Sequence, residues 1–391
     1  MQYESANRRT FLKTMGAAGM LSALPEAAFG LHVGGGYIAH EVVAPGDDVD
    51  AKPKYSIKFG VIGLDHAHIM GITAAVIRGG GELAAFYSTL PRGIAAFQKL
   101  YPNARLAKSE DEILNDPSIQ LVASASIPNL RAPLGIRVMK HGKDYLSDKP
   151  AITTLEQLAE VRKVSAETGK IFAIMYSERL EVRAAVQAGY LVKAGAIGKV
   201  VQTINIAPHQ VNAPSRPDWF WDSVQYGGIL CDIGSHQADQ FVYYTGSTTA
   251  SVTASQIANV NYPNHPAFQD FGDMMLNGNG GAGYVRVDWF TPDGLGTWGD
   301  GRLFILGTEG YIELRKYIDI AGHPGGNHLF IVDHKQTRYM DCSNVALPFG
   351  PQLVADIVNR THTAQDQQQA LLAAELVLKA QKYAKVLTFT A

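Results

Sequence analysis

The stretch Ile57-Lys-Phe-Gly-Val-Ile-Gly63-Leu-Asp-His-Ala-His68 decides the fold of this chain. Its first six residues are rich in β-branched and aromatic side chains, which is typical of a buried strand. Gly63 ends that run, and apolar residues with helical spacing follow from Ile69 to Ile77. A strand that turns at a glycine into a helix predicts the first unit of a doubly wound, parallel sheet.

The same alternation continues for about 120 residues beyond this stretch. A parallel sheet with helices on both faces is therefore predicted for residues 55–176. The further strands are expected at residues 83–87, 119–124, 144–147 and 171–175, and the helices at residues 93–100, 111–114, 133–141 and 154–168.

The second half of the chain has a different pattern, because one helix at residues 180–194 is followed mainly by strands. Asn277-Gly-Asn-Gly-Gly281 is a hairpin signal between two of them. An amphipathic helix at 370–384 closes the chain. We therefore predict a second, α+β domain with a large, mostly antiparallel sheet. Its strands are expected at residues 200–206, 251–260, 270–276, 283–290, 302–306 and 311–315.

Composition excludes several classes of protein. Of the 391 residues, 46% are hydrophobic and 18% are charged, so the chain can bury a large core. The net charge of -2 excludes a strongly basic nucleic-acid binder and a polybasic membrane-surface protein. Two cysteines are too few for a disulfide framework or a four-cysteine zinc site. No apolar run approaches the roughly 20 residues of a spanning helix, so no membrane partner is expected.

The N-terminus resembles a twin-arginine export signal. Arg8-Arg9 precedes Phe11-Leu12-Lys13, and a short, weakly apolar stretch follows at residues 14–24. We expect residues 1–30 to be a signal peptide, residues 31–54 to be a linker or arm, and the protein to be periplasmic. A short surface helix with a chance arginine pair is the alternative.

Two motifs then point to one family. The segment Asp148-Lys149-Pro150 follows a predicted strand of the first domain, and Asp232-Ile-Gly234-Ser-His236-Gln-Ala-Asp239 opens a predicted helix of the second. Together, and in this order across the expected domain boundary, they resemble the Glu-Lys-Pro and Asp-x-Gly-x-His-x-x-Asp motifs of the glucose-fructose oxidoreductase, inositol dehydrogenase and MocA family (Gfo/Idh/MocA). Ile127-Pro128-Asn129 and Leu306-Gly-Thr-Glu-Gly310 are further matches.

The resemblance covers residues 57–386 and implies a nicotinamide-dependent oxidoreductase. Residues 55–176 would form the dinucleotide-binding Rossmann domain, and residues 177–391 the substrate and oligomerisation domain. The implied substrate is a ring hydroxyl of a sugar or cyclic polyol, and the implied assembly is a dimer or tetramer. A bound-cofactor glycosidase or lyase that works by transient oxidation, and a sugar-binding protein without catalysis, remain alternatives.

The resemblance also implies the catalytic residues. Alcohol oxidation by hydride transfer needs a base for the hydroxyl proton. His236 would be the proton acceptor, with Lys149 and Asp232 positioning and tuning it. Four residues separate Asp232 from His236, which would place them on one face at a helix start.

The phosphate loop departs from the family pattern. Of the usual three glycines only Gly63 is present, while Asp65 and His68 stand at the other two positions. His66 and His68 can donate hydrogen bonds to a phosphate instead. A His-x-His pair after a strand also resembles the metal motif of hydrolase barrels, but eight βα units are missing, so no metal site is expected.

Other candidates line the cofactor and the substrate. A carboxylate is missing after the second strand, and Ser88, Thr89 and Arg92 stand there instead, the pattern that favours NADP over NAD; a polar turn without cofactor contact is the alternative. By resemblance, Pro128, Asn129, Asp148 and Lys149 would also contact the cofactor. Tyr176 and Arg179 would open the substrate cleft. Trp219 and Trp221 would either stack on a sugar ring or pack in the core.

Overall fold

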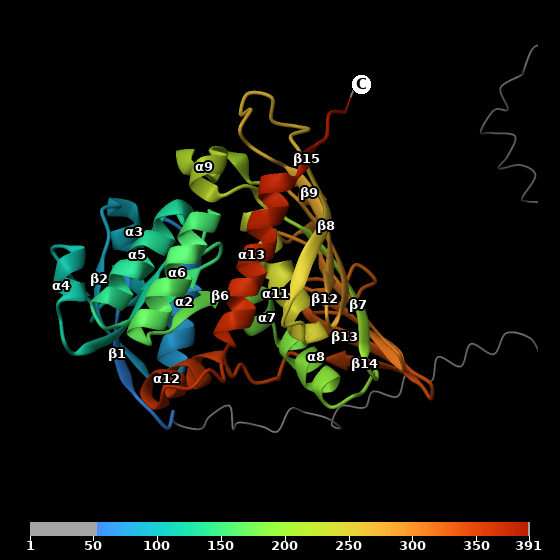
Figure 1. The fold of residues 1–391 in the computed structure, drawn as a ribbon, viewed down its shortest axis with the longest axis horizontal. Helices are drawn as coiled ribbons and strands as arrows, with labels where there is room; N and C mark the ends of the chain where they lie inside the picture. Colours follow the sequence, from blue (N-terminus) through green and yellow to red (C-terminus); the bar gives the residue numbers. More distant parts are fainter. Residues whose placement is uncertain (1–52, 390–391) are drawn as a thin grey trace, which may run out of the picture. The chain divides into compact units, whose positions relative to one another are not determined.

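A computed structural model describes residues 53–389. The predicted signal peptide and almost all of the predicted arm, residues 1–52, lie outside the described residues. Those that are described belong to one compact unit that contains two β-sheets (Figure 1).

The first sheet confirms the predicted Rossmann-type half. Its six strands lie in the order β3-β2-β1-β4-β5-β6 and pair in parallel throughout. Chain order therefore reverses between β1 and β4, at the switch point where doubly wound sheets bind ligands. The strands are β1 (Ile57–Ile62), β2 (Gly81–Tyr87), β3 (Arg105–Leu106), β4 (Ile119–Ser124), β5 (Asp144–Asp148) and β6 (Phe172–Met175), and the helices between them are α2 (His68–Arg78), α3 (Pro91–Leu100), α4 (Glu110–Leu114), α5 (Pro128–Lys140) and α6 (Leu155–Thr168).

Local signals set the ends of α6. The Thr154 hydroxyl accepts a hydrogen bond from the backbone N–H of Gln157, which satisfies one of the unpaired donors at the helix start. Gly169 ends the helix with a φ of 64°, a left-handed conformation that glycine adopts without steric cost. These are the start and stop signals that made this helix predictable from the sequence.

The second sheet has nine strands and confirms the predicted α+β half. It is mostly antiparallel, with parallel pairs between β7 and β10 and between β8 and β15. The sequence analysis missed three strands of this sheet: β13 and β14 extend one edge, and the two-residue β15 lies at the other. The order is β14-β13-β12-β11-β7-β10-β9-β8-β15, formed by β7 (Val200–Pro208), β8 (Ala250–Ala258), β9 (Phe271–Gly278), β10 (Gly281–Asp288), β11 (Gly301–Gly307), β12 (Gly310–Lys316), β13 (Asn327–Asp333), β14 (Thr337–Asp341) and β15 (Lys385–Val386).

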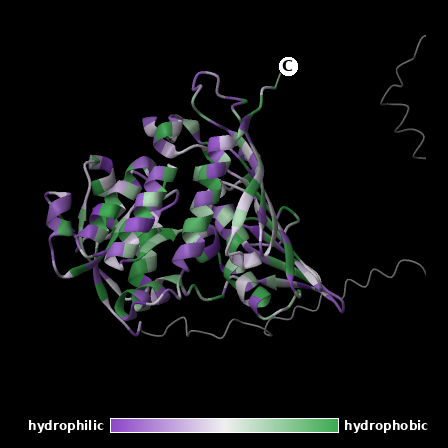
Figure 2. Cartoon of the chain, viewed as in Figure 1, coloured by the Kyte–Doolittle hydropathy of each residue, from purple (hydrophilic) through white to green (hydrophobic). Residues whose placement is uncertain are grey.

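Helices cover one face of this sheet. α8 (Arg183–Lys193) packs on β12 and β13, α11 (Gly234–Thr245) on β7 and β10, and α13 (Gln367–Tyr383) on β8 (Figure 1). Buried apolar residues recur every three or four positions along α13, as expected for a helix with one buried side (Figure 2). The opposite face carries exposed apolar side chains, among them Met275, Leu306 and Tyr311. The other helices of this half are α7 (Ser177–Leu180), α9 (Ser223–Tyr226), α10 (Ile229–Asp232) and α12 (Phe349–Asn359).

The C-terminal segment ties the two sheets together. α12 packs on α2, and α13 packs on α6 and β6. β6 is an edge strand, and side-chain amides pair with its backbone: Gln365 both accepts from the N–H and donates to the carbonyl of Ile174, while Gln367 accepts from the N–H of Phe172. The second half thus satisfies backbone groups that the first sheet leaves open.

No helix within residues 53–389 is long and apolar enough to cross a membrane.

A close helix–strand contact at Gly135 gives a test of this packing. A Cβ atom added there would lie 2.5 Å from Phe172 and Tyr145 ring atoms, whereas one added at Gly71 would meet no atom within 4 Å. We predict that Gly135→Ala lowers the free energy of unfolding by about 1–3 kcal/mol through overpacking. Gly71→Ala, the matched control in a helix interior, should raise it by about 0.5–1 kcal/mol. Urea unfolding measures both, and equal effects of the two substitutions would contradict the packing described.

Candidate active site

The carboxyl edge of the first sheet opens into a cavity of about 270 Å³. Its wall combines residues that follow β1, β4 and β5 with residues of the second half, so that both halves contribute to it. The lining residues are His66, His68, Pro128, Arg131, Lys149, Ser177, Glu178, His209, Gln210, Arg216, Trp219, Phe220, Asp232, His236, Trp289, Trp298 and Tyr317.

The two predicted motifs meet in this cavity. Lys149, directly after β5, donates a hydrogen bond from Nζ to Oδ1 of Asp232, at 2.9 Å and 83 positions further along the chain. Burial alone would raise the pKa of Asp232, but the Lys149 ammonium beside it lowers that pKa below its ordinary value. The pair is therefore ionised, a carboxylate against an ammonium, at the cavity wall.

The helix expected to hold Asp232 and His236 is broken between them. Asp232 is the last residue of α10, and His236 lies in the first turn of α11, with Ile233 joining the two helices. The prediction of a single helix start was therefore wrong, although both side chains line the cavity. The break is one residue long, and Ile233 itself has helical φ and ψ angles of -76° and -49°.

His236 is buried and incompletely bonded. The residue is 3% exposed, and its buried Nδ1 has no hydrogen-bond partner. Burial lowers the pKa of His236 to about 3, with Lys149 acting in the same direction and Glu178 opposing. The imidazole is thus neutral near pH 7, and the residue lies at the wall of the cavity.

A second buried ion pair lies beside this histidine. Glu178 of α7 accepts from Lys316 Nζ at 2.6 Å and from Gln237 Nε2 at 2.9 Å. Burial would raise the pKa of Glu178, but Lys316 holds it well below its usual range. Sequence reasoning missed Lys316, because nothing in the pattern at the end of β12 distinguishes it from a solvent-exposed strand residue.

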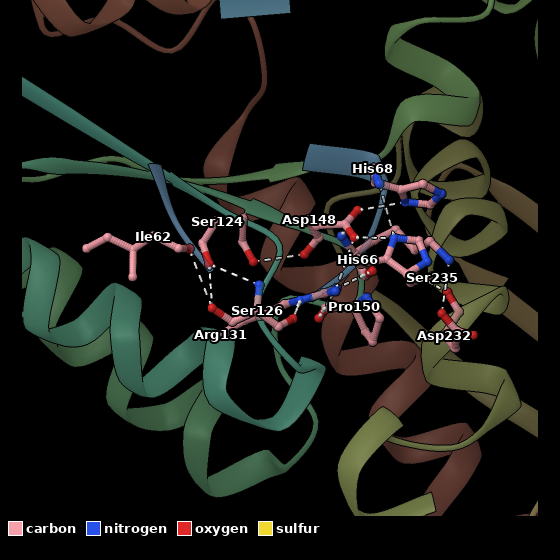
Figure 3. A network of polar contacts seen from close by, with 12 residues as sticks. Ile62, His66, His68, Ser124, Ser126, Arg131, Asp148, Pro150, Asp232 and Ser235 are labelled. Carbon is pink, nitrogen blue, oxygen red and sulfur yellow. Dashed lines mark hydrogen bonds and ion pairs between the residues drawn. The ribbon is translucent and has the colours of Figure 1, made fainter. Parts of the chain in front are cut away.

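The loop after β1 brings His66 and His68 to Asp148, the last residue of β5 (Figure 3). His66 Nδ1 lies 3.3 Å from Oδ2 of Asp148, and His68 Nδ1 lies 3.1 Å from Oδ1. Among the described residues these three side chains form a group with metal-ligand spacing, which the sequence analysis did not expect. Asp148 therefore faces the loop rather than standing alone as a cofactor contact.

Arg131 of α5 organises the same edge of the sheet, and sequence reasoning did not single it out. The buried guanidinium donates from Nε to the carbonyl of Ser126 at 2.7 Å and from Nη1 to the carbonyls of Lys149 and Pro150. Its Nη2 lies 3.1 Å from Oδ2 of Asp148. A fixed fork of donors suits Arg to such a position.

A nicotinamide dinucleotide has a reactive end, a ribose and phosphates to be held here. The residues fit the first two of these parts in the usual way. Lys149 and Pro128 lie at the cavity beside the switch point, where the reactive end of such a cofactor belongs. Ser88, Thr89 and Arg92 lie at the carboxyl end of β2, where a ribose would be held; the Ser88 hydroxyl accepts from the N–H of Leu90, and the other two are exposed.

The phosphate part is built differently. Gly63 has a φ of 85° and approaches Ser126 closely, as a tight glycine turn requires. Past it, Asp65 and His68 replace the usual second and third glycines, and partial burial raises the pKa of Asp65. Imidazole N–H groups can donate to phosphate, so the chemistry of the loop still suits an anion.

The predicted substrate residues separate into two groups. Trp219 lines the cavity, with its ring centroid 6.2 Å from that of His66. Trp221 instead stacks on His265, with centroids 4.1 Å apart. Neither Tyr176 nor Arg179 lines the cavity: the Tyr176 hydroxyl donates to the carbonyl of Ala370, and Arg179 forms a buried, bidentate pair with Asp239. Asn129 is also outside it, beside Pro128.

Two family models match the chain over the two halves just described. Residues 57–176 match the oxidoreductase family with an NAD-binding Rossmann fold, and residues 185–313 match the Gfo/Idh/MocA C-terminal domain. The chain belongs to the Gfo/Idh/MocA oxidoreductase family. The oxidoreductase class and the cofactor class, NAD or NADP, follow from this membership.

Individual relatives agree with this placement. A solved structure titled "putative oxidoreductase", from Erwinia carotovora atroseptica SCRI1043, is 45% identical, with a TM-score of 0.83, and the match covers 85% of this chain and all of that one. The D-xylose dehydrogenase of Paenarthrobacter nicotinovorans is 26% identical over 32% of this chain and 34% of its own length. An NAD(+) scyllo-inositol 2-dehydrogenase of Bacillus subtilis is 26% identical over 59% and 67%, respectively.

The buried histidines give a prediction for the pH dependence of stability. Burial lowers the pKa of His209 to about 4 and that of His236 to about 3, whereas an unfolded histidine titrates near 6.5. Between about pH 6.5 and pH 4 the unfolded chain therefore binds protons that the folded chain does not, and stability falls as the pH falls. Thermal melts across this range should show a melting temperature that falls with falling pH. It should fall less steeply in His209→Gln.

His362→Gln, which changes an exposed histidine, is the control for this series. The same slope in the wild type and in His209→Gln would show that His209 is not held neutral by its surroundings.

Proposed function

We propose that this protein oxidises a ring hydroxyl of a sugar or cyclic polyol, or reduces the corresponding ketone, with NAD or NADP as its cofactor. The observation that carries the proposal is the convergence of Lys149, Asp232 and His236 on one cavity from two sequence motifs and from both halves of the chain. Each residue taken alone has an ordinary structural explanation, but an ion pair and a neutral, buried imidazole at the same cavity are the parts of an acid–base site.

His236 is the proton acceptor in this proposal. Its neutral imidazole lines the cavity and can take the hydroxyl proton of a bound alcohol. Lys149 keeps its ammonium beside Asp232, where it polarises the reacting oxygen and stabilises the negative charge that develops as the proton leaves. The cofactor, when bound, supplies the acceptor for the hydride. In the reverse direction the protonated imidazole returns the proton to the carbonyl oxygen.

The substrate side of the cavity favours a sugar-like ring. Trp219, Trp289 and Trp298 contribute aromatic faces to its wall. His209 lies between two of these rings, with centroid distances of 5.5 Å to Trp289 and 4.5 Å to Trp298. Apolar ring faces beside polar groups suit the C–H faces and hydroxyls of a carbohydrate. The xylose and inositol dehydrogenases among the relatives support the same class of substrate.

Substitution of the acid–base residues tests this mechanism. His236→Ala and Lys149→Met should each lower turnover by roughly 10²–10⁴-fold, which is the usual contribution of a positioned proton-transfer group. The two losses should not add in the double variant, because both residues act on one proton. Steady-state kinetics on a panel of sugars and polyols measures this, after melts confirm that the variants are folded.

Lys140→Met is the matched control, since Lys140 is an exposed lysine that lies 3.8 Å from the exposed carboxylate of Glu160. It should leave turnover unchanged. Near-normal turnover of either His236→Ala or Lys149→Met, on a substrate that the wild type uses, would show that the assignment of the site is wrong.

We also propose that the open face of the nine-stranded sheet pairs subunits into a dimer or tetramer. Leu306 and Tyr311 are cross-strand neighbours on β11 and β12, 45% and 41% exposed, and Met275 is 52% exposed on β9. Apolar side chains gathered on one sheet face are typical of a protein interface.

The oligomer prediction has a simple test. Light scattering should give a dimer or tetramer at micromolar concentration, and Leu306→Lys with Tyr311→Glu should give a smaller species, because the pair places charges in the interface. Leu100→Lys, on an exposed apolar residue of α3, is the control. A monomeric wild type would contradict the proposal.

A further inference from the structure

We propose that His66, His68 and Asp148 bind a divalent transition-metal ion at the wall of the cavity. The proposal does not rest on the sugar oxidation proposed above, because it concerns what the loop after β1 binds and not which reaction follows. Its evidence is the geometry of the three side chains, the fixed orientation of the buried Asp148 carboxylate, and the position of the loop.

The spacing of the side chains matches a metal site. His66 Nδ1 and His68 Nδ1 lie 3.3 and 3.1 Å from the two oxygens of Asp148, and one ligand atom from each residue falls within 4.8 Å of the others. Ligands that surround a tetrahedral ion at about 2.0–2.2 Å lie about 3.3–3.6 Å from one another. Small rotations of the imidazoles would therefore place one ion between all three.

The carboxylate of Asp148 is buried and held in one orientation. The side chain is 1% exposed, and Oδ1 accepts from the backbone N–H of Lys149 at 2.8 Å and lies within hydrogen-bond distance of His68. Arg131 Nη2 lies 3.1 Å from Oδ2, and His66 Nδ1 lies 3.3 Å from the same oxygen. The guanidinium and the backbone N–H thus fix the carboxylate so that each of its oxygens faces one imidazole.

The ligand set indicates the class of metal. Two imidazoles and one carboxylate suit Zn²⁺ or Fe²⁺, and leave coordination positions open for an oxygen ligand. The carboxylate of such a site is itself held by further donors. Here those donors are the guanidinium of Arg131 and the backbone N–H of Lys149.

The location connects the ion with the cavity. His66 and His68 line it together with Lys149, so the open coordination positions face the same space. The loop stands where a glycine-rich turn would cradle phosphates with backbone N–H groups. A metal ion there would accept an oxygen ligand in place of that turn, either a dinucleotide phosphate or a substrate hydroxyl.

Metal binding by the full-length protein is the direct test. Protein stripped with a chelator should bind one equivalent of Zn²⁺ by calorimetry, retain it through gel filtration, and melt at a higher temperature when it is bound. His66→Gln and His68→Gln should each weaken Zn²⁺ binding by at least about 10–100-fold. His362→Gln, remote from the site on the surface, should bind as the wild type does. Unchanged binding in both loop variants, or no stoichiometric binding by the wild type, would overturn the proposal.

His66 is partly buried, so His66→Gln could fail to fold, and His68→Gln then keeps the test decisive. The His68 side chain is 42% exposed, so its replacement has little effect on packing, and a melt of the metal-free variant checks this. A folded His68→Gln protein that binds Zn²⁺ as tightly as the wild type excludes His68 as a ligand.

Co²⁺ in place of Zn²⁺ distinguishes the two oxygen ligands. Its visible absorption changes when a ligand enters the coordination sphere. A change on addition of NAD or NADP, but not of sugars, assigns the open position to phosphate, and a change on addition of sugars or polyols alone assigns it to the substrate. If neither class of compound changes the absorption, the inference that the ion has open coordination positions is wrong.

Discussion

The ion pair between Lys149 and Asp232 is the contact on which the site depends. It joins the carboxyl edge of the parallel sheet to the junction of α10 and α11, at 2.9 Å. Both side chains are largely buried, so neither charge would be tolerated without the other. The pair therefore requires the two halves of the chain to be held in one arrangement, which places the cavity and His236 between them.

Other contacts maintain that arrangement. Gln365 and Gln367 satisfy the edge strand β6 from the C-terminal segment, and Arg360 forms a bidentate pair with Asp144 at the start of β5. Buried backbone groups and buried charges are costly when they are unpaired. The geometry of the acid–base residues is thus held by contacts that lie away from the cavity, on the rigid elements of both sheets.

Two departures of this chain from the family pattern meet at Asp148. The family motif has Glu where this chain has Asp, and the phosphate loop has lost two of its three usual glycines and carries His66 and His68. The shorter acid sits against both histidines and Arg131. The two departures therefore belong to one local arrangement, in which a carboxylate and two imidazoles occupy the space beside the switch point.

Local pattern was enough to determine much of this protein. The period of apolar residues and the glycine and threonine signals predicted both sheets and most helices, and the two motifs identified Lys149, Asp232 and His236, because local propensity and motif spacing are properties of the chain itself. Only the tertiary structure decided that Asp232 and His236 lie on different helices and that Trp219 lines the cavity while Trp221 does not. It also decided that Lys316 pairs with Glu178 and Arg131 with Asp148. Those outcomes depend on contacts between residues far apart in sequence, where burial and pairing of charge, rather than local periodicity, determine which way a side chain turns.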